Sequence, residues 1–345
     1  MFSFPPYRSI FPITRRHLLK TAGSGAAMAA ATGIPRPLFA ANQLKVAAIY
    51  TVPVEQQWVS RIHKAANTAK ERGEIEYVFA ENIANPDYER VMREFCEAGH
   101  RLILGEAFGV EQAARAVARD YPNTCFLMGS SLKPDEAIPN FAVFDNYIQD
   151  ATYLTGMVAG AMTQAKKIGM VGGYPVPEVN RLMNAFMAGA REVQPDIRFQ
   201  LAFVDSWFDP ARERVIALAH IDAGADILYA ERLGVVGAAQ ERGILAIGNV
   251  VDAQTVYPET VITSALWHFE PTLDKAVAQV NAGIFKAGDY SIYSLMKEGG
   301  CSMAPLGAFE NKVPEAVKAK VVALEAAIKS GTFEVEVNDA VPQPG

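Results

Sequence analysis

Hydrophobic and polar positions alternate along the chain in a regular succession of short apolar runs and longer amphipathic stretches. The short runs at residues 45–50 and 75–80 predict buried strands, and the longer stretches at 57–72 and 86–98 have the apolar spacing of helices. Strands separated by helices of this length pair in parallel, with helices on both faces of the sheet. The pattern therefore predicts one Rossmann-like lobe. Its remaining elements are predicted at 101–105, 110–120, 124–129 and 141–144.

A long apolar helix at residues 147–163 follows, and the alternation then starts again, which predicts a second lobe of the same kind. The further predicted elements are 168–171, 179–193, 199–204, 210–223, 227–229, 234–241, 245–248, 261–266, 271–282, 291–295, 313–330 and a last strand at 333–337. No linker rich in Gly, Ser or Pro separates the two halves, so we expect several crossing segments between them. The predicted fold class is α/β, with two Rossmann-like lobes of parallel sheets joined by a three-segment hinge.

The same pattern suggests where the lobes begin and end. One economical arrangement places residues 44–146 and 265–290 in the N-terminal lobe, and residues 147–264 and 291–345 in the C-terminal lobe. The carboxyl ends of parallel strands then face a cleft between the lobes, where open α/β sheets bind their ligands.

The first forty residues have the order of regions found in an export signal. The stretch 14–20 (TRRHLLK) resembles the twin-arginine motif, a weakly apolar Ala/Gly stretch covers 21–33, and Leu38, Phe39 and Ala40 form a cleavage site. No cysteine lies near that site, so a lipid anchor is not expected. No later run reaches the ~20 apolar residues of a membrane span. These features predict a periplasmic protein exported by the twin-arginine route.

Composition excludes several classes of partner. Half of the 345 residues are hydrophobic and 20% are charged, as in a globular protein. Beyond the first forty residues the chain has 27 basic and 38 acidic residues, an excess that argues against binding to nucleic acid or to anionic membranes. Cys96, Cys125 and Cys301 have no metal-ligand spacing and are expected as buried thiols, although a Cys96–Cys125 disulfide remains open. We expect a monomer.

Catalytic motifs are missing from the chain. It has no GxGxxG after a strand, no GxxxxGK[ST] and no GxSxG, so dinucleotide, P-loop and hydrolase chemistry are not indicated. His268 and Glu270 have the H-x-E spacing of zinc deaminases, but the PCxxC partner of that motif is absent. We therefore expect no enzymatic activity, no metal and no cofactor.

The loops that follow the predicted strands combine aromatic side chains with carboxylates and amides. Flat rings can sandwich a planar heterocycle, while Asp, Glu and Asn pair with the donors and acceptors on its edge. This combination favours an uncharged, aromatic, hydrogen-bonding solute. The candidate ligand-binding residues are Trp58, Phe108, Asp145, Tyr174, Trp207, Phe208, Glu231, Asn249, Asp252 and Trp267.

Several segments together resemble the basic membrane protein family, the purine-nucleoside-binding components of ABC importers. They are Ala107-Phe108-Gly109 through Pro122, 153–160 (YLTGMVAG), Gly172-Gly173, 208–211 (FDPA), 224–226 (GAD) and 246–248 (AIG). The resemblance extends from Lys45 to about Phe309. It implies a type I periplasmic binding protein fold, capture of a ligand without chemistry, and a membrane permease as partner.

The departures from the family pattern suggest a narrower ligand. Phe108 and Asp145 match the positions that stack on and hydrogen-bond the base. The family has an Asp and an Asn in the first loop, where this chain has residues 55–58 (EQQW), so a carboxylate is retained but the Asn is replaced; a Lys expected after Thr-Ser-x-x is replaced by Trp267. The resemblance then implies a free purine base such as adenine, with tryptophan in the space of the ribose. A nucleoside, a periplasmic sensor that presents its ligand to a receptor, and an enzyme acting on a heterocycle remain alternatives.

Overall fold

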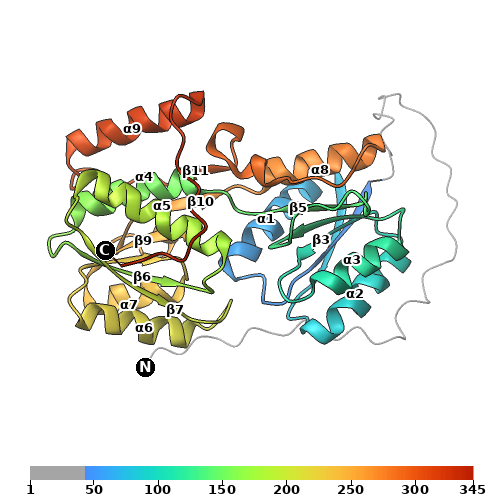
Figure 1. Cartoon of the computed structure of the whole chain (residues 1–345), viewed down its shortest axis with the longest axis horizontal. Coiled ribbons are helices and arrows are strands. Elements are labelled where there is room, and N and C mark those ends of the chain that lie inside the picture. Colours follow the sequence, from blue (N-terminus) through green and yellow to red (C-terminus); the bar gives the residue numbers. More distant parts are fainter. Residues whose placement is uncertain (1–42, 345) are drawn as a thin grey trace, which may run out of the picture. The chain divides into compact units, whose positions relative to one another are not determined.

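The computed structural model of the chain describes residues 43–344. The twin-arginine segment and cleavage site expected in residues 1–40 lie outside this range. Within it, two α/β lobes are built on two separate, mostly parallel sheets, as the sequence predicted (Figure 1). None of the helices formed by residues 43–344 combines the length and the apolar character needed to cross a membrane.

The first lobe has a five-stranded parallel sheet in the order β2-β1-β3-β4-β5. Its strands are β1 (Leu44–Ile49), β2 (Ile75–Ala80), β3 (Leu102–Glu106), β4 (Cys125–Gly129) and β5 (Phe141–Phe144). Its helices are α1 (Gln57–Glu71), α2 (Asn85–Glu97) and α3 (Glu111–Asp120). Helix α1 begins where the Gln56 side chain accepts a hydrogen bond from the amide of Val59. Helices α2 and α3 pack together on one side of the sheet, and α1 packs with the later helix α8 on the other (Figure 1).

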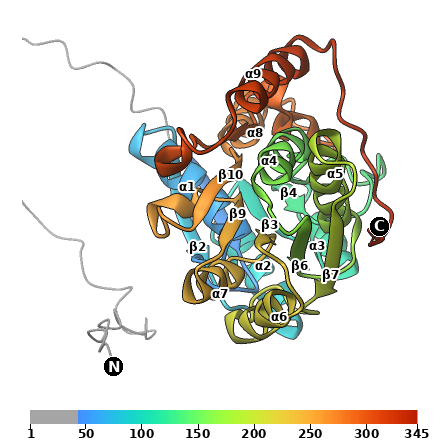
Figure 2. The same cartoon turned by 90° about the vertical axis from the view of Figure 1, so that its left-hand side faces the viewer.

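The second lobe has a six-stranded sheet in the order β11-β10-β9-β8-β6-β7. Its strands are β6 (Lys167–Gly172), β7 (Arg198–Phe203), β8 (Ile227–Ala230), β9 (Leu245–Val250), β10 (Val261–Trp267) and β11 (Cys301–Met303). The helices that follow β5 are α4 (Gln149–Met162), α5 (Pro177–Val193), α6 (Pro210–Asp222), α7 (Gly234–Arg242), α8 (Glu270–Ala282) and α9 (Glu315–Ser330). The pairs α4–α5 and α6–α7 cover opposite faces of this sheet (Figure 2).

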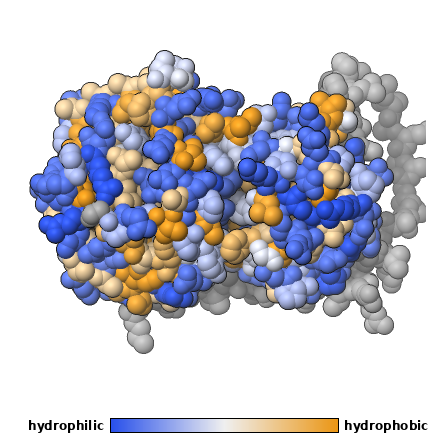
Figure 3. Space-filling view, in the orientation of Figure 1, coloured by the Kyte–Doolittle hydropathy of each residue, from blue (hydrophilic) through white to orange (hydrophobic). Residues whose placement is uncertain are grey.

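Helices α4 and α5 approach each other closely because glycines lie at their contact. A Cβ atom on Gly189 would overlap the carbonyl oxygen of Tyr153, and one on Gly156 would overlap that of Phe186. The apolar run that predicted α4 is therefore buried on nearly all sides. On the face seen in Figure 3, hydrophobic residues lie in small patches among hydrophilic ones.

The structure differs from the predicted elements in the last part of the chain. Residues Ser291–Ser294 form a 3-10 helix, and strand β11, which was not predicted, pairs antiparallel with β10. The strand predicted at 333–337 is wrong, because this segment belongs to neither sheet. The alternation of apolar and polar residues in this segment still has a physical basis, because Val335 is buried and Phe333 packs against the main hydrophobic core. Strand β10 also keeps residues 265–267, which the sequence assigned to the first lobe, in the second sheet.

Three segments connect the lobes, between β5 and α4, between β10 and α8, and between α8 and β11. A single hydroxyl group links all three. The indole Nε1 of Trp267 donates to Ser294 Oγ (3.0 Å), and Ser294 Oγ donates to the main-chain oxygen of Asp145 (2.8 Å). Trp267 is fully buried and packs on Trp58 and Phe269 in the hydrophobic core that extends through both lobes.

Candidate functional site

A small cavity lies between the ends of the first-lobe strands and the loops of the second lobe, and we call it the inner cavity. Its lining residues are Val52, Gln56, Trp58, Glu106, Ser130, Asn146, Glu178, Trp207, Glu231 and Arg232. Its volume of about 20 Å³ is close to that of one water molecule. A larger ligand therefore enters only if the lobes separate or the lining side chains move.

Aromatic rings from the two lobes meet beside the inner cavity. Phe108, after β3, contacts Trp207, after β7, edge to face at 5.1 Å between ring centroids. Tyr174, after β6, contacts both Phe108 (5.3 Å) and Trp207 (4.9 Å). Because Phe108 and Trp207 come from different lobes, they separate when the lobes open and can close on a flat ligand between them.

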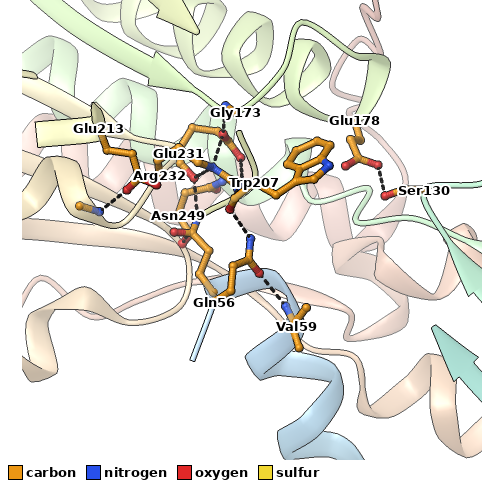
Figure 4. A network of polar contacts seen from close by, with 12 residues as sticks. Gln56, Val59, Ser130, Gly173, Glu178, Trp207, Glu213, Glu231, Arg232 and Asn249 are labelled. Atoms are coloured by element: carbon orange, nitrogen blue, oxygen red, sulfur yellow. Dashed lines mark hydrogen bonds and ion pairs between the residues drawn. The ribbon is translucent and has the colours of Figure 1, made fainter. Parts of the chain in front are cut away.

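A buried ion pair supports the Trp207 side of the cavity. Arg232 Nη2 donates to Glu231 Oε1 (2.6 Å), and both side chains are almost completely buried. Glu231 Oε2 also accepts from the amide of Gly173 (2.9 Å), and Arg232 Nη1 donates to the Trp207 carbonyl (3.2 Å). Burial raises the pKa of the Glu231 carboxyl, although the adjacent guanidinium opposes this. In Figure 4 this network lies on one side of Trp207, and the indole extends from it toward Glu178.

Two glutamine side chains connect the lobes at this point. Gln56 Nε2 donates to the Trp207 carbonyl (3.3 Å), and Gln57 Nε2 donates to the Glu231 carbonyl (2.5 Å). Both residues lie at the start of α1, in the stretch where the family pattern has Asp and Asn. Their side-chain amides therefore donate to main-chain oxygens of the second lobe in this conformation. Unlike an Asp, they bring no charge to this position.

Glu178 and Ser130 form a further contact between the lobes. Ser130 follows β4 and donates from its Oγ to Glu178 Oε2 (2.6 Å) in the first turn of α5 (Figure 4). Burial is the main cause that raises the pKa of Glu178 to about 8, and the nearby negative charges of Asp145 and Glu231 act in the same direction. Ser130 and Arg181 oppose the shift. A neutral carboxyl is the result near pH 7.

A second, larger space continues from this contact, and we call it the outer cavity. Its volume is about 480 Å³, and both lobes contribute to its walls. The lining residues that carry polar or aromatic groups are Phe108, Glu111, Ser130, Ser131, Lys133, Phe144, Asp145, Tyr147, Glu178, Arg181, Asp289 and Ser291. The volume is in the range of small-molecule sites.

Asp145 is held inside the outer cavity by Arg181. Arg181 Nη1 donates to Asp145 Oδ2 (2.6 Å), and Arg181 Nε donates to Asp339 Oδ1 (3.0 Å) in the C-terminal segment. The Arg181 guanidinium also lies over the Tyr147 ring at 3.9 Å. Burial raises the pKa of Asp145, and the positive charge of Arg181 opposes this shift.

Several buried polar atoms at the inner cavity have no hydrogen-bond partner within residues 43–344. They are Nε1 of Trp58, Nε1 of Trp207 and Oδ1 of Asn146, and the side-chain amide of Asn249 lies nearby without partners. Two indole donors and an amide acceptor on residues that line one small cavity are groups that a polar heterocycle could satisfy if the side chains turned toward it, because buried polar groups are costly when unpaired.

The ten candidate residues from the sequence divide into three groups. Trp58, Trp207 and Glu231 line the inner cavity, and Phe108 and Asp145 line the outer one. Tyr174 and Asn249 lie directly beside them. Tyr174 contacts the rings of Phe108 and Trp207, and the main chain of Asn249 accepts from Gln57.

Three candidates lie outside both cavities. Phe208 is 43% exposed, and Asp252 caps a short 3-10 helix by accepting from the amide of Gln254. Trp267 lies in the connection between the lobes, as described above. A position after a strand was thus not enough to place a side chain in the cleft.

The sequence analysis missed Ser130, Glu178 and Arg181. Ser130 follows the fourth strand of the first lobe. The loop after that strand was not among those from which the candidate residues were taken. Glu178 lies four residues beyond Tyr174, in the first turn of α5, where an acidic residue is expected for helix stability alone. The signal for Arg181 was its position one turn after Glu178, on the same face of α5.

The H-x-E sequence does not form a metal site. His268 Nε2 bonds to Ser302 Oγ (2.8 Å), and Glu270 pairs with Arg61 (3.6 Å). Residues 43–344 contain no group of three or more His, Cys, Asp or Glu side chains that could hold a metal ion. In the same range, Cys96, Cys125 and Cys301 are free thiols, so the disulfide left open by the sequence is not formed here.

Comparison with known proteins agrees with this geometry. Residues 48–339 match the sequence profile of the family described as ABC transporter substrate-binding protein PnrA-like, which is most of the chain. The chain belongs to this family. As a PnrA-like protein it is an ABC transporter substrate-binding protein, and the basic membrane protein resemblance seen in the sequence is confirmed.

Three relatives have names that describe a ligand. One of them is a sugar binder, a putative ABC transporter glucose-binding protein of Haloferax volcanii that is 29% identical over 268 residues, 77% of this chain and 66% of that protein. A purine-binding protein of Brucella abortus is 33% identical over 299 residues, which are 85% of this chain and 83% of that protein. An ABC transporter nucleoside-binding protein of Lactococcus lactis is 29% identical over 154 residues, 44% of this chain and 43% of that protein.

The fold is shared with solved structures of ABC transporter solute-binding proteins. An ABC transporter solute-binding protein from Aeropyrum pernix superposes with a TM-score of 0.72 at 18% identity, covering 86% of this chain and 94% of that one. At this identity the likeness supports the α/β two-lobed fold of a periplasmic binding protein and not the ligand.

Proposed function

We propose that this PnrA-like protein captures a free purine base, such as adenine, between its two lobes in the periplasm and delivers it to an ABC importer permease. The observation that carries the proposal is the meeting of Trp58 and Trp207 at one cavity, each with an unpartnered indole N–H group. A purine offers flat faces to these rings and ring nitrogens to their donors. The protein would act by capture and release, without catalysis.

The choice of a base over a nucleoside rests on the volume near Trp58. The Trp58 ring stacks on Phe144 (5.6 Å) and contacts Trp267 (5.4 Å) behind it. Of these three rings only Trp58 lines the inner cavity, and Phe144 and Trp267 support it; Trp58 and Trp267 stand at the two positions where the family pattern has polar residues for ribose. Replacing charged and amide groups by indole rings removes partners for sugar hydroxyls, which favours a ligand without sugar.

Closure of the lobes would couple binding to recognition by the permease. We propose that residues 44–146 with 265–290 move against residues 147–264 with 291–345, apart from the end of β10. The ligand stabilises the closed form because it contacts both lobes only there. A monomer suffices for this mechanism.

Isothermal titration calorimetry with adenine, guanine, adenosine and guanosine tests the proposal, with glucose as the non-purine control. We expect adenine to bind more tightly than adenosine. Tighter binding of the nucleosides would contradict the choice of a base, and binding of glucose alone would contradict a purine ligand. Mass spectrometry of the ligand retained after native purification gives an independent answer. Deletion of the gene separates this function from that of a periplasmic sensor, because purine uptake should be lost if the protein serves an importer and should persist if it is a sensor.

A further inference from the structure

Glu178 occupies a special position among the charged residues of the site. Ser130 and Glu178 are the two residues that line both the inner and the outer cavity, and of these only Glu178 can ionise. It lies in the first turn of α5 in the second lobe, while Ser130 belongs to the first. A ligand held between the lobes would therefore pass or contact this carboxyl group.

The two oxygens of Glu178 differ in their surroundings. Oε2 accepts the hydrogen bond from Ser130 Oγ (2.6 Å), whereas Oε1 has no hydrogen-bond partner among the described residues. A proton on a carboxyl group held in this way resides on the oxygen that is not already accepting. Oε1 is then a hydrogen-bond donor directed at whatever occupies the cavity.

The charges around Glu178 keep this proton in place near neutral pH. Asp145 after β5 and Glu231 after β8 repel a second negative charge, and burial acts in the same direction. Arg181, on the same helix, is the opposing cation, but it is already paired with Asp145 and Asp339. The pKa of Glu178 is raised to about 8 by these surroundings.

Three further charged groups line the outer cavity. Glu111 is paired with Arg115, also of α3, so its charge is compensated locally. Asp289 and Lys133 come from the two loops on either side and carry opposite charges. Around the inner cavity, Glu231 is paired with Arg232 in the same way as Asp145 is paired with Arg181, so burial and not net charge is the main cause that favours the neutral form of Glu178.

Purine bases differ at the position that such a donor would contact. Adenine presents an unprotonated N1 beside its 6-amino group, whereas hypoxanthine and guanine carry a hydrogen on N1 beside a 6-oxo group. A neutral carboxyl group donates to the N1 of adenine and can accept from the 6-amino group. An ionised carboxylate can only accept, which suits N1–H and places two lone pairs against each other with adenine.

We propose that Glu178 reads this edge of the base: its neutral form donates from Oε1 to the unprotonated N1 of adenine and also pairs with a 6-oxopurine, donating to O6 and accepting from N1–H, whereas its ionised form disfavours only the 6-aminopurines. This inference rests on the proposed purine-binding function. Glu178 thereby becomes a specificity-determining residue that the sequence did not indicate, and Ser130 is the residue that positions it.

The test is calorimetric titration of the full chain with adenine and with hypoxanthine at about pH 7 and about pH 9. If only the neutral form binds adenine, a pKa of about 8 makes the apparent affinity fall about tenfold over this interval. The affinity for neutral hypoxanthine, obtained after correction for the fraction of this base that is itself ionised at about pH 9, should not fall, so the ratio of the two affinities should change by about tenfold. Equal losses for both bases would mean that pH acts on lobe closure and would overturn the proposal.

Two variants separate Glu178 from other titrating groups. Glu178→Gln retains a donor but cannot ionise, so its adenine affinity should become the same at both pH values. Glu192→Gln is the matched control: it makes the same change on the same helix, at a surface ion pair with Lys320, and should keep the wild-type tenfold effect. A tenfold loss that persists in Glu178→Gln would assign the titration to Asp145 and refute the role of Glu178.

The outcomes also separate this inference from the proposed function. If the wild-type protein binds purines with an adenine affinity that is independent of pH, the purine site stands and the role of Glu178 fails. If it binds no purine at either pH, both fail. The wild-type titration requires no variant, so a variant that does not fold leaves the test intact.

Discussion

Replacing Trp207 by alanine tests whether the two lobes grip a flat ligand between their rings. In the closed arrangement this ring contacts Phe108 at 5.1 Å and Tyr174 at 4.9 Å, and its main-chain oxygen accepts from Gln56 and Arg232. The substitution removes the ring and keeps the main-chain bonds. It therefore isolates the contribution of the aromatic surface to ligand binding.

The size of the effect follows from the stacking contacts. Stacking of one aromatic side chain on a base is worth about 1–3 kcal/mol by alanine substitution. Loss of the contacts with Phe108 and Tyr174 also weakens closure, so we expect the middle of this range, about 2 kcal/mol, or about a 30-fold rise in the Kd for adenine. Because the Trp207 side chain is only partly buried, the free energy of unfolding should change little.

Calorimetry with adenine measures the change in Kd, and urea denaturation measures the change in stability. Phe208→Ala is the matched control, since Phe208 is adjacent in sequence, 43% exposed and lines neither cavity. It should bind adenine like the wild type. An unchanged Kd in Trp207→Ala, or an equal loss in both variants, would refute the placement of the ligand against this ring.

Two further predictions concern the framework of the site. Gly189→Ala should lower the free energy of unfolding by about 3 kcal/mol or more, because its Cβ would overlap the Tyr153 carbonyl at the α4–α5 contact. Gly237→Ala on α7 is the control and should be neutral or slightly stabilising, since the nearest atom to its Cβ is 3.8 Å away. Urea denaturation compares the two variants, and equal stabilities would contradict the packing of α4 on α5. Ser294→Ala should leave the buried Trp267 Nε1 without a hydrogen-bond partner and lower the free energy of unfolding by about 1–3 kcal/mol. Thermal unfolding should show this as a lower Tm. An unchanged Tm would show that the link between the crossing segments is not formed in solution.

The sequence predicted most elements of the fold because their burial is encoded locally. Strand β1 has an apolar run that both faces of a parallel sheet require, and α4 is apolar on nearly all sides because it is packed among α5, α9 and strands β10 and β11. Strand β11 was missed because three residues carry no periodicity, and its pairing with β10 depends on a chain reversal after α8. The segment at 333–337 has a strand's alternation but no partner strand.

The site was predicted less completely than the fold. The structure brings Phe108, Trp207 and Glu231 to the cavities, as predicted from their positions after strands, because side chains after parallel strands gather at one edge of each sheet. Their neighbours Glu178 and Ser130 were not, because a glutamate in a first helical turn and a serine in a loop have ordinary local explanations. Glu178 and Ser130 come from different lobes and contact each other only where the lobes meet. That contact depends on the tertiary structure and has no local signal in the sequence.

The link at Ser294 has a mechanical consequence. A hinge made of three independent segments can bend, twist and slide. The ligand-bound protein would then occupy many different arrangements of its two lobes. Ser294 Oγ joins the three connecting segments at one point, so we expect rotation about that point to be easier than sliding of one segment past another. Closure of the lobes would then follow mainly one rotation, and a protein that receives the loaded form could recognise the lobe angle.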